Sequence, residues 1–508
     1  MAAVSSLTKL IRQRAQNVTY NSTNVQAQLD SLPIWSLADP RWGADATGAT
    51  DSTARIQACF NYVGSRGGGT VYIPATPGDG AAANNQGYKV SGSIEVPAFV
   101  NIQGEGFSSC LRASTTLPGG LLRLKAHGSV GGRFIRDIRL SGNNGGTGIG
   151  TDLEATDTET KHIYGWMLED VFIESFEWGL QLQGMWHSTL LNVTTSACRV
   201  GLHLWGQNVS INILGSHFRR DSRDRKDTFG IVIQPRVYAW SPDQTRGSRS
   251  ETIVMGGEFM CIGQEYGIYV HDVLDLQISN MDLDYIFLIA IAILNVNGGC
   301  NISDGWIAAD STGTTQFSGI VFANPLDVQQ MKTVRGLHMN LANNNPLANN
   351  QGVAIASQKV GKVAIRDCTF SGGWAGVDIY QNTAGVIIDG NIFAGNTLSL
   401  RSSGMVTITN NRLDNVTETG KAAVNTYMGN NNGKFTDGIV QVSMPASANS
   451  GSLQLPNPVA GATYVAELMG NNSAQTSDFA WVEGSVVRVS RATPVAVVLN
   501  AYVRVTML

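Results

Sequence analysis

The chain has 508 residues, of which 15% are charged and 57 are glycine, and its formal net charge is −4. This weakly acidic balance argues against nucleic acid as the main partner. No segment approaches 18 consecutive apolar residues, so we expect no membrane-spanning helix. The sequence also lacks the basic and then apolar pattern of a signal peptide, so we expect a protein made in the cytoplasm.

The first 34 residues differ from the rest. The stretch SLTKLIRQRAQ places Leu7, Leu10 and Ile11 at helical spacing, and TNVQAQLDSL is compatible with a second short helix. We interpret residues 1–34 as a helical leader that attaches the chain to another protein or helps it to oligomerise. A frayed end without a function is the alternative.

From Trp35 onward the sequence favours short strands and tight turns. A loop rich in glycine and aspartate precedes a short amphipathic helix with Ile56, Phe60 and Val63 on one side, and the turn GGGTVYIP then leads into a strand. Because these glycines precede a strand and no GKS or GKT follows, we reject a phosphate-binding loop.

Five motifs of this region, in their order, carry a resemblance. They are GAD (43–45), DST (51–53), IQ (56–57), GGGTVYIP (67–74) and IQGEG (102–106). This order resembles the start of pectate-lyase-like β-helix proteins, and in particular the opening of bacteriophage tailspike depolymerases. The resemblance implies a fold and says little about catalysis, because these residues form the capped entry to the β-helix.

The following residues repeat, which supports the same fold independently. A short strand, a polar turn and a second short strand recur in segments such as IRDCTFSGGWAGVDI and IDGNIFAGNTLSL, and Glu258, Asp282 and Trp306 are spaced by 24 residues. Such a period without helical patterning is typical of a solenoid of strands. We predict an all-β, right-handed parallel β-helix over residues 35–429, with 35–110 as its capped entry.

Residues 430–508 follow a different pattern. Segments such as GIVQVSMP and GSLQLPNP alternate like antiparallel strands, with proline and glycine between them. We predict a C-terminal antiparallel β-sandwich. In tailspikes such a module helps to form the trimer, so the resemblance implies a homotrimer. Packing around a three-fold axis would also explain apolar outward stretches such as FLIAIAIL (287–294).

The candidate catalytic residues are three carboxylates. Stacked strands hold equivalent residues about 4.8 Å apart, and our alignment places His217, Glu258 and Asp282 in one outward column, with Asp284 two positions further along. A separation of about 5 Å between Glu258 and Asp282 would suit a retaining glycosidase, whereas about 8 Å between Glu258 and Asp284 would suit an inverting one.

Three close carboxylates cannot all ionise freely, so one is expected to act as the general acid. We favour Glu258 or Asp282 as the acid and Asp284 as the base. The trio resembles the one glutamate and two aspartates that several phage tailspike hydrolases present on neighbouring rungs. A different set of carboxylates, or charged residues without a catalytic role, are the alternatives.

A long insertion between His217 and Glu258 predicts loops beside these carboxylates, because solenoids accept insertions on one face, often the binding face. Aromatic side chains there would stack on sugars and arginines would hold acidic groups, although salt bridges and solvated charges are the competing interpretation. The predicted substrate-binding residues are His217, Arg219, Arg223, Tyr238, Trp240, Arg246, Tyr269, His271 and Trp306.

Tyr269 and His271 belong to an alternative reaction. β-Elimination from a uronic acid needs a group that neutralises the carboxylate and a base such as tyrosine or histidine. These two residues are predicted on the second sheet of the rung that carries Glu258, so a lyase stays open. A structural histidine is the competing interpretation of His271.

The six cysteines stand in no CxxC pair and at no metal-ligand spacing, which predicts reduced, mostly buried thiols, no metal and no cofactor.

Together with the resemblance, these patterns predict a phage tailspike, an endo-acting glycoside hydrolase of the virion tail that cleaves a polysaccharide at the bacterial surface. Its expected partners are that polysaccharide (O-antigen, capsule or exopolysaccharide), a tail, baseplate or adaptor protein and further copies of itself, without membrane insertion. A receptor-binding spike without activity and a secreted bacterial enzyme are the rivals.

Overall fold

The structure is a computed structural model, and it divides the chain into two compact units, residues 1–274 and 275–508. The structure describes residues 34–77, 87–125, 133–152, 162–220, 226–235, 249–296, 298–309, 317–323, 331–341, 353–358, 362–373, 375–380 and 385–394, together with shorter segments between 19 and 24 and between 397 and 506.

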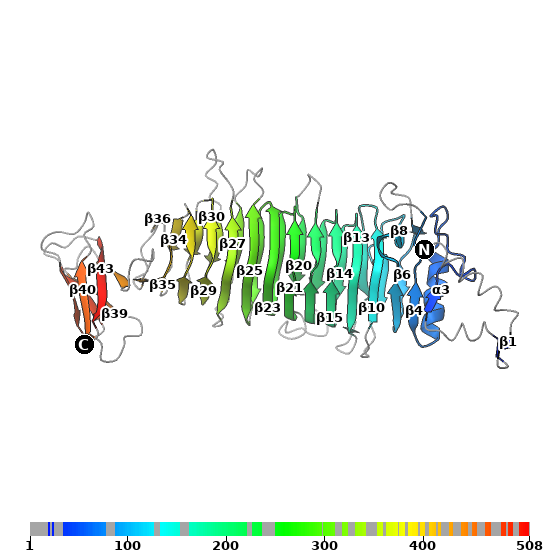
Figure 1. Cartoon of the computed structure of the whole chain (residues 1–508), viewed down its shortest axis with the longest axis horizontal. Coiled ribbons are helices and arrows are strands. Elements are labelled where there is room, and N and C mark those ends of the chain that lie inside the picture. The colour runs from blue at the N-terminus through cyan, green and yellow to red at the C-terminus, as the bar shows by residue number, and fades with distance from the viewer. Residues whose placement is uncertain are drawn as a thin grey trace. The chain divides into compact units, whose positions relative to one another are not determined.

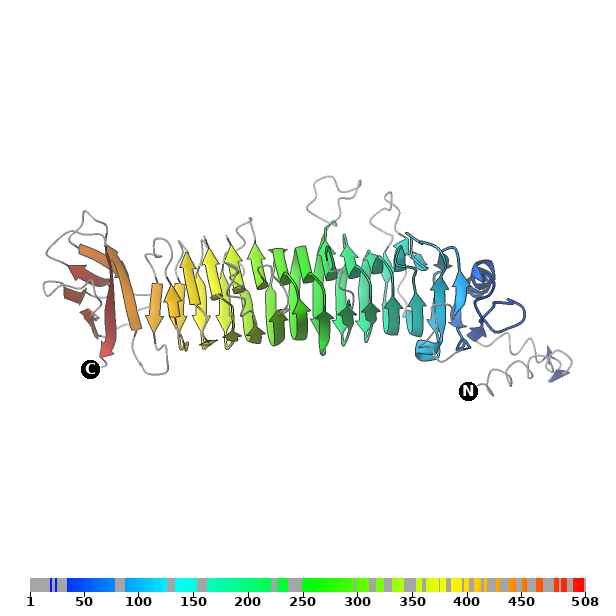
Figure 2. The same cartoon turned by 90° about the horizontal axis from the view of Figure 1, so that it is seen from above.

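The β-helical part of the first unit begins at a helix that covers its first strands. Helix α3 (Thr53–Ser65) buries Ile56, Phe60 and Val63, which confirms the predicted amphipathic helix. Strand β4 (Gly69–Tyr72) follows and pairs in parallel with β3 (Ile34–Ser36) and β7 (Val100–Gln103). Gly68 allows this close packing, because a Cβ there would lie 2.4 Å from the carbonyl oxygen of Phe99. Figure 2 shows α3 beside these strands.

The rest of the first unit is a stack of parallel strands (Figure 1). In β13 the burial alternates from residue to residue, so that one face fills the core and the other faces outward. The successive pairings along one sheet join β10 (Arg133–Ser141), β13 (Trp166–Glu174), β15 (Met185–Leu191), β18 (Val209–Leu214) and β21 (Ser250–Gly256). Those along a second sheet join β11 (Thr147–Asp152), β14 (Trp178–Gln183), β17 (Val200–Trp205), β20 (Phe229–Gln234) and the start of β23 (Tyr266–Ile286).

The second unit repeats the same construction. The end of β23 pairs in parallel with β25 (Cys300–Ala309), and β25 pairs with β27 (Lys332–Asn340). A neighbouring set joins β24 (Ile289–Val296), β26 (Ser318–Ala323), β28 (Val353–Gln358) and β31 (Ala375–Tyr380). Together with the first unit, this confirms the predicted all-β fold and the parallel β-helix.

From β10 onward, rungs bend at a residue with a positive φ angle, and these corner residues stack on one another. Asparagine, aspartate and glycine tolerate this left-handed backbone conformation better than other residues do. The corner residues are Asp137, Asp170, Asn192, Gly215 and Gly257 in the first unit and Asn280, Asp304, Gly336, Asp367, Gly390 and Asn410 in the second. A column of these residue types therefore sets the register of the strands that follow.

The two ends of the chain agree in part with the prediction. Thr19–Tyr20 (β1) pairs antiparallel with Thr23–Asn24 (β2), so the second predicted helix does not begin at Thr23, and the rest of the leader lies outside the described residues. Near the C-terminus, β43 (Val497–Thr506) pairs antiparallel with β38 (Gly438–Met444) and β40 (Thr463–Leu468). β42 (Val486–Ser490) pairs likewise with β39 (Ser450–Gln454) and β41 (Phe479–Glu483). The antiparallel pairing is confirmed, whereas the sandwich packing and the domain limits stay predictions.

All six cysteines are free and buried, as predicted. Among the described residues, no helix combines the length and apolar character needed to cross a membrane.

His203 on β17 gives the first unit a predictable dependence on pH. Its ring is 3% exposed and stacks with Trp178 at 4.9 Å and Trp205 at 5.8 Å between ring centroids. Burial lowers the pKa of His203 from 6.5 to about 4. The unfolded state therefore binds more protons between these two pKa values, and the free energy of unfolding falls as the pH is lowered from 6.5 to 4.

We expect this loss to reach about 3 kcal/mol at pH 4. His203→Phe removes the titration, so thermal unfolding of this variant should change less between pH 7 and pH 4.5 than that of the intact protein. His271→Gln, which changes an exposed histidine of the same unit, is the matched control. An equal pH dependence in the intact protein and His203→Phe would contradict the role of His203.

Candidate functional site

The structure corrects the predicted column of His217 and Glu258. β19 (His217–Arg219) pairs with β22 (Phe259–Ile262), and His217 lies opposite Met260. Glu258 is exposed, precedes β22 and has a φ of 63°. The prediction that His217 and Glu258 share a column is therefore wrong.

The physical reason is one extra residue at the corner. Before the corner, Leu214 lies opposite Gly256, and after the corner, His217 lies opposite Met260. The offset grows from 42 to 43 residues, and Glu258 is the residue inserted. Bulges of this kind re-aim side chains and are frequent beside active sites, so Glu258 stays a candidate in the first unit.

The predicted lyase residues lie on the other sheet of the first unit. Tyr269 belongs to an aromatic cluster, with its ring centroid 6.0 Å from that of Phe229 and 6.4 Å from that of Tyr266. His271, two residues further along β23, is exposed. Four other predicted binding residues lie outside the described residues, namely Arg223, Tyr238, Trp240 and Arg246.

In the second unit, Asp282 and Trp306 share one outward row. Asp282 of β23 lies opposite Trp306 of β25, and Trp306 lies opposite His338 of β27. The rings of Trp306 and His338 are stacked, with 4.8 Å between their centroids and 11° between their planes. Both side chains are exposed, and that of Trp306 to 37%. The row therefore offers a carboxyl group beside a flat aromatic surface.

Asp284 lies on the same side of β23 as Asp282, since one buried residue, Leu283, separates them. The backbone N–H of Tyr285 donates a hydrogen bond of 2.9 Å to Oδ1 of Asp284, which orients the carboxyl group. Oδ1 of Asp282 is shielded from solvent. These two carboxyl groups thus differ in surroundings while facing the same side.

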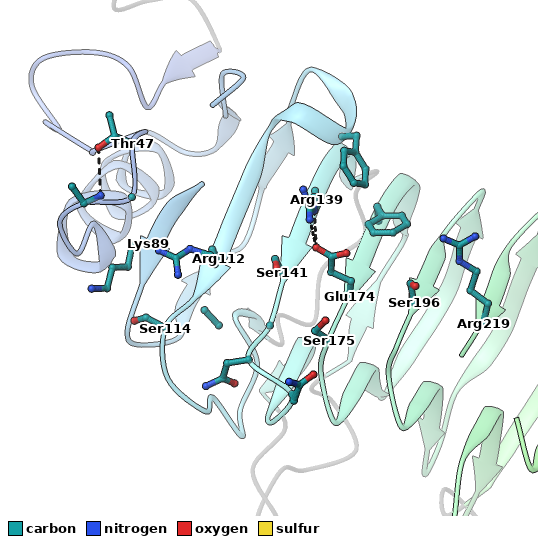
Figure 3. A pocket seen from close by; sticks show the side chains of 18 residues that line it. Thr47, Lys89, Arg112, Ser114, Arg139, Ser141, Glu174, Ser175, Ser196 and Arg219 are labelled. Carbon is teal, nitrogen blue, oxygen red and sulfur yellow. Dashed lines mark hydrogen bonds and ion pairs between the residues drawn. The ribbon is translucent and has the colours of Figure 1, made fainter. Parts of the chain in front are cut away.

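A pocket of about 1170 Å³ lies on the outward face of the first unit (Figure 3). We call this pocket the basic groove. It follows a row of residues on six successive strands, each opposite a residue of the next strand. The row consists of Lys89, Arg112, Ser141, Glu174, Ser196 and Arg219. At about 4.8 Å per strand, it spans roughly 24 Å. The structure places the predicted residue Arg219 at one end of this groove.

Two phenylalanines and an ion pair complete the wall of the basic groove. Phe107 and Phe172 meet edge to face, with 4.9 Å between ring centroids. The guanidinium of Arg139 lies over the ring of Phe107 at 4.3 Å, and its Nε donates a hydrogen bond of 2.8 Å to Oε1 of Glu174. The groove thus combines apolar ring surface with charged groups.

Sequence reasoning did not identify His338 or the basic groove. Their residues are far apart in the chain, and only the exact register of the strands brings them together. The corner residues carry a signal that could have fixed this register, because an asparagine, aspartate or glycine recurs at each corner.

Comparisons with known proteins agree with the parallel β-helix. No family model matches the chain. The tailspike protein of E. coli bacteriophage HK620, solved in complex with a pentasaccharide, matches in structure with a TM-score of 0.53 at 12% identity, over 99% of this chain and 100% of that one. A mutant form of the same tailspike, also with a pentasaccharide, gives a TM-score of 0.52. These likenesses show the fold.

The sequence comparison shows the family. The chain is 39% identical over 467 residues to the tail spike protein of Shigella phage Sf6, which covers 91% of this chain and 73% of that protein. The chain therefore belongs to the tail spike proteins of bacteriophages, components of the virion tail.

Proposed function

We propose that this tail spike binds a bacterial surface polysaccharide and depolymerises it by glycoside hydrolysis. The observation that carries the proposal is the row of Asp282, Trp306 and His338, in which a carboxyl group adjoins an exposed aromatic stack. Flat aromatic surfaces accept the apolar faces of sugar rings, and paired carboxyl groups perform glycoside hydrolysis. The pentasaccharide bound to the HK620 tailspike supports this class of ligand.

Asp282 and Asp284 stand two residues apart on one side of β23, and we assign them as the pair of carboxyl groups for hydrolysis with a bound water. Residues two apart on a strand are about 6.6 Å apart, and inverting glycosidases hold their carboxyl groups about 6.5–9.5 Å apart. Asp282, which lies opposite Trp306 in the outward row, is assigned as the proton donor. Asp284 then activates the water. Glu258 is a third candidate carboxylate, and its role is tested by Glu258→Gln.

The alternative lyase reaction has less support. A tyrosine that acts as the base must lose its proton readily, but burial raises the pKa of Tyr269 above its ordinary value of 10. The aromatic cluster around Tyr269 is the cause of that burial. Hydrolysis is therefore the reaction that we propose.

Trp306→Ala should raise the KM for the polysaccharide about ten-fold, because the loss of one stacking surface costs about 1.4 kcal/mol of binding free energy. The kcat should change little, since Trp306 takes no part in proton transfer. The measurement is initial rates of reducing-end release from the polysaccharide that the intact protein degrades. Trp306→Phe should recover much of the affinity.

Ile392→Ala is the matched control for Trp306→Ala. Ile392 is 41% exposed and continues the same outward row two strands beyond His338. An unchanged KM in Trp306→Ala, or the same rise in Ile392→Ala, would contradict the stacking role.

The assembly of this tail spike is part of the proposal. We propose a homotrimer in which the C-terminal antiparallel strands contribute to trimer formation, and a leader that binds a tail, baseplate or adaptor protein. The tail spike family supports this assembly.

A further inference from the structure

The basic groove carries more positive than negative charge. Among the residues that the structure describes, its charged lining residues are Lys89, Arg112, Arg139 and Arg219 on the positive side and Glu174 on the negative side. Glu174 is engaged by Arg139, so its charge is already compensated within the groove. An excess of cations in a concave site attracts anions and strengthens their binding.

Lys89 and Arg112 form the end of the groove where this excess is concentrated. They lie opposite each other on β5 (Tyr88–Val90) and β8 (Cys110–Ala113), so their backbones are about 4.8 Å apart and both side chains can reach one anion. Among the described residues, neither takes part in an ion pair. Figure 3 shows both side chains beside Ser114.

Arg112 supplies a second, independent indication. Its Nε is buried and has no hydrogen-bond partner among the described residues. A buried guanidinium N–H without a partner is costly, and an anion seated beside it would remove that cost. Arginine also matches the planar, bidentate geometry of carboxylate and phosphate groups.

The neutral lining of the groove is suited to a sugar. Ser114, Ser141, Asn143 and Asn144 provide hydroxyl and amide groups for sugar hydroxyls, and Phe107, exposed to 46%, provides apolar surface. We propose that Lys89 and Arg112 bind a negatively charged substituent of a glycan, a uronate carboxylate or a phosphate, in the first unit. This inference rests on the proposed binding of surface polysaccharide, and it specifies a polysaccharide that carries negatively charged substituents.

The test uses two probes, tetragalacturonic acid and its methyl ester, in which each carboxylate is replaced by an uncharged ester, titrated calorimetrically into the full chain. We expect the acid to bind at least ten-fold more tightly than the ester in 50 mM NaCl, and the difference to shrink in 500 mM NaCl because salt screens charge. Arg112→Gln and Lys89→Gln should each lower the affinity for the acid at least ten-fold. Arg366→Gln, at an exposed arginine of β29 (Val363–Arg366), should leave it unchanged.

Inorganic phosphate distinguishes the two sources of charge. Inorganic phosphate and free galacturonate are each used to displace the bound acid. If phosphate displaces it at the lower concentration, the natural substituent is a phosphate. If galacturonate displaces it at the lower concentration, the natural substituent is a uronate. Equal binding of the acid and the ester, or unchanged binding in both Arg112→Gln and Lys89→Gln, would overturn the inference. Neither probe has to be cleaved, so this result is separate from the depolymerisation of surface polysaccharide, which can stand or fail by itself.

Discussion

Asp284→Asn should lower the kcat of polysaccharide depolymerisation by roughly 10²–10⁴-fold, the usual contribution of a general base. Asparagine preserves the size of the side chain and can still accept the hydrogen bond from the N–H of Tyr285. It cannot accept a proton from water. Asp282→Asn should give a loss of the same order, because the leaving group then receives no proton. The KM should change little in either variant, since the stacking surface of Trp306 is intact.

The matched control is Asp367→Asn, a change at an exposed corner residue of the same unit, which should keep the activity of the intact protein. Glu258→Gln tests whether Glu258 takes part in catalysis together with Asp282 and Asp284. A loss as large as that in Asp284→Asn would add Glu258 to the catalytic residues, and full activity would leave the chemistry to the second unit. Full activity in both Asp282→Asn and Asp284→Asn would refute our assignment.

Asn391→Ala should destabilise the second unit by about 3 kcal/mol or more. Oδ1 of the buried Asn391 accepts the backbone N–H of Cys368 at 2.9 Å, and its Nδ2 donates to the carbonyl of Ile365 at 3.0 Å. Nδ2 also donates to Oδ1 of Asn411, which is buried one strand further along. Alanine removes the side-chain partner of the N–H of Cys368 and of the carbonyl of Ile365, whereas Oδ1 of Asn411 keeps the backbone N–H at position 391. Each buried group left without a partner costs about 1–3 kcal/mol.

The measurement for Asn391→Ala is urea denaturation followed by circular dichroism, compared with Asn301→Ala. Asn301 is an exposed asparagine of β25 in the same unit, so its replacement should change stability by less than about 0.5 kcal/mol. A loss below about 1 kcal/mol in Asn391→Ala would show that the stacked asparagines are not needed for stability.

The fold was predictable because it repeats. Alternating apolar residues and a recurring spacing define the rungs, and they do so without knowledge of any single contact. The helix that buries Ile56 and Val63 was equally predictable, since its apolar residues follow helical spacing.

The site was predictable only in part, because a row on a β-helix depends on register. The shared side of Asp282 and Asp284 follows from alternation alone, and the structure agrees. The column of His217 and Glu258 required an exact count across a long insertion, and a single bulged residue was enough to displace it. The two aspartates of this strand are tolerated because they face outward, away from the apolar core.

The most direct test of the account is a digestion of purified surface polysaccharides from a panel of bacteria, with the products analysed by mass spectrometry. We expect saturated fragments that have gained one water for each bond cut, with no such fragments from Asp284→Asn. Fragments that lack this water and carry an unsaturated uronate would contradict hydrolysis and make the protein a lyase. If every polysaccharide of the panel stayed intact, the proposed depolymerisation itself would be contradicted.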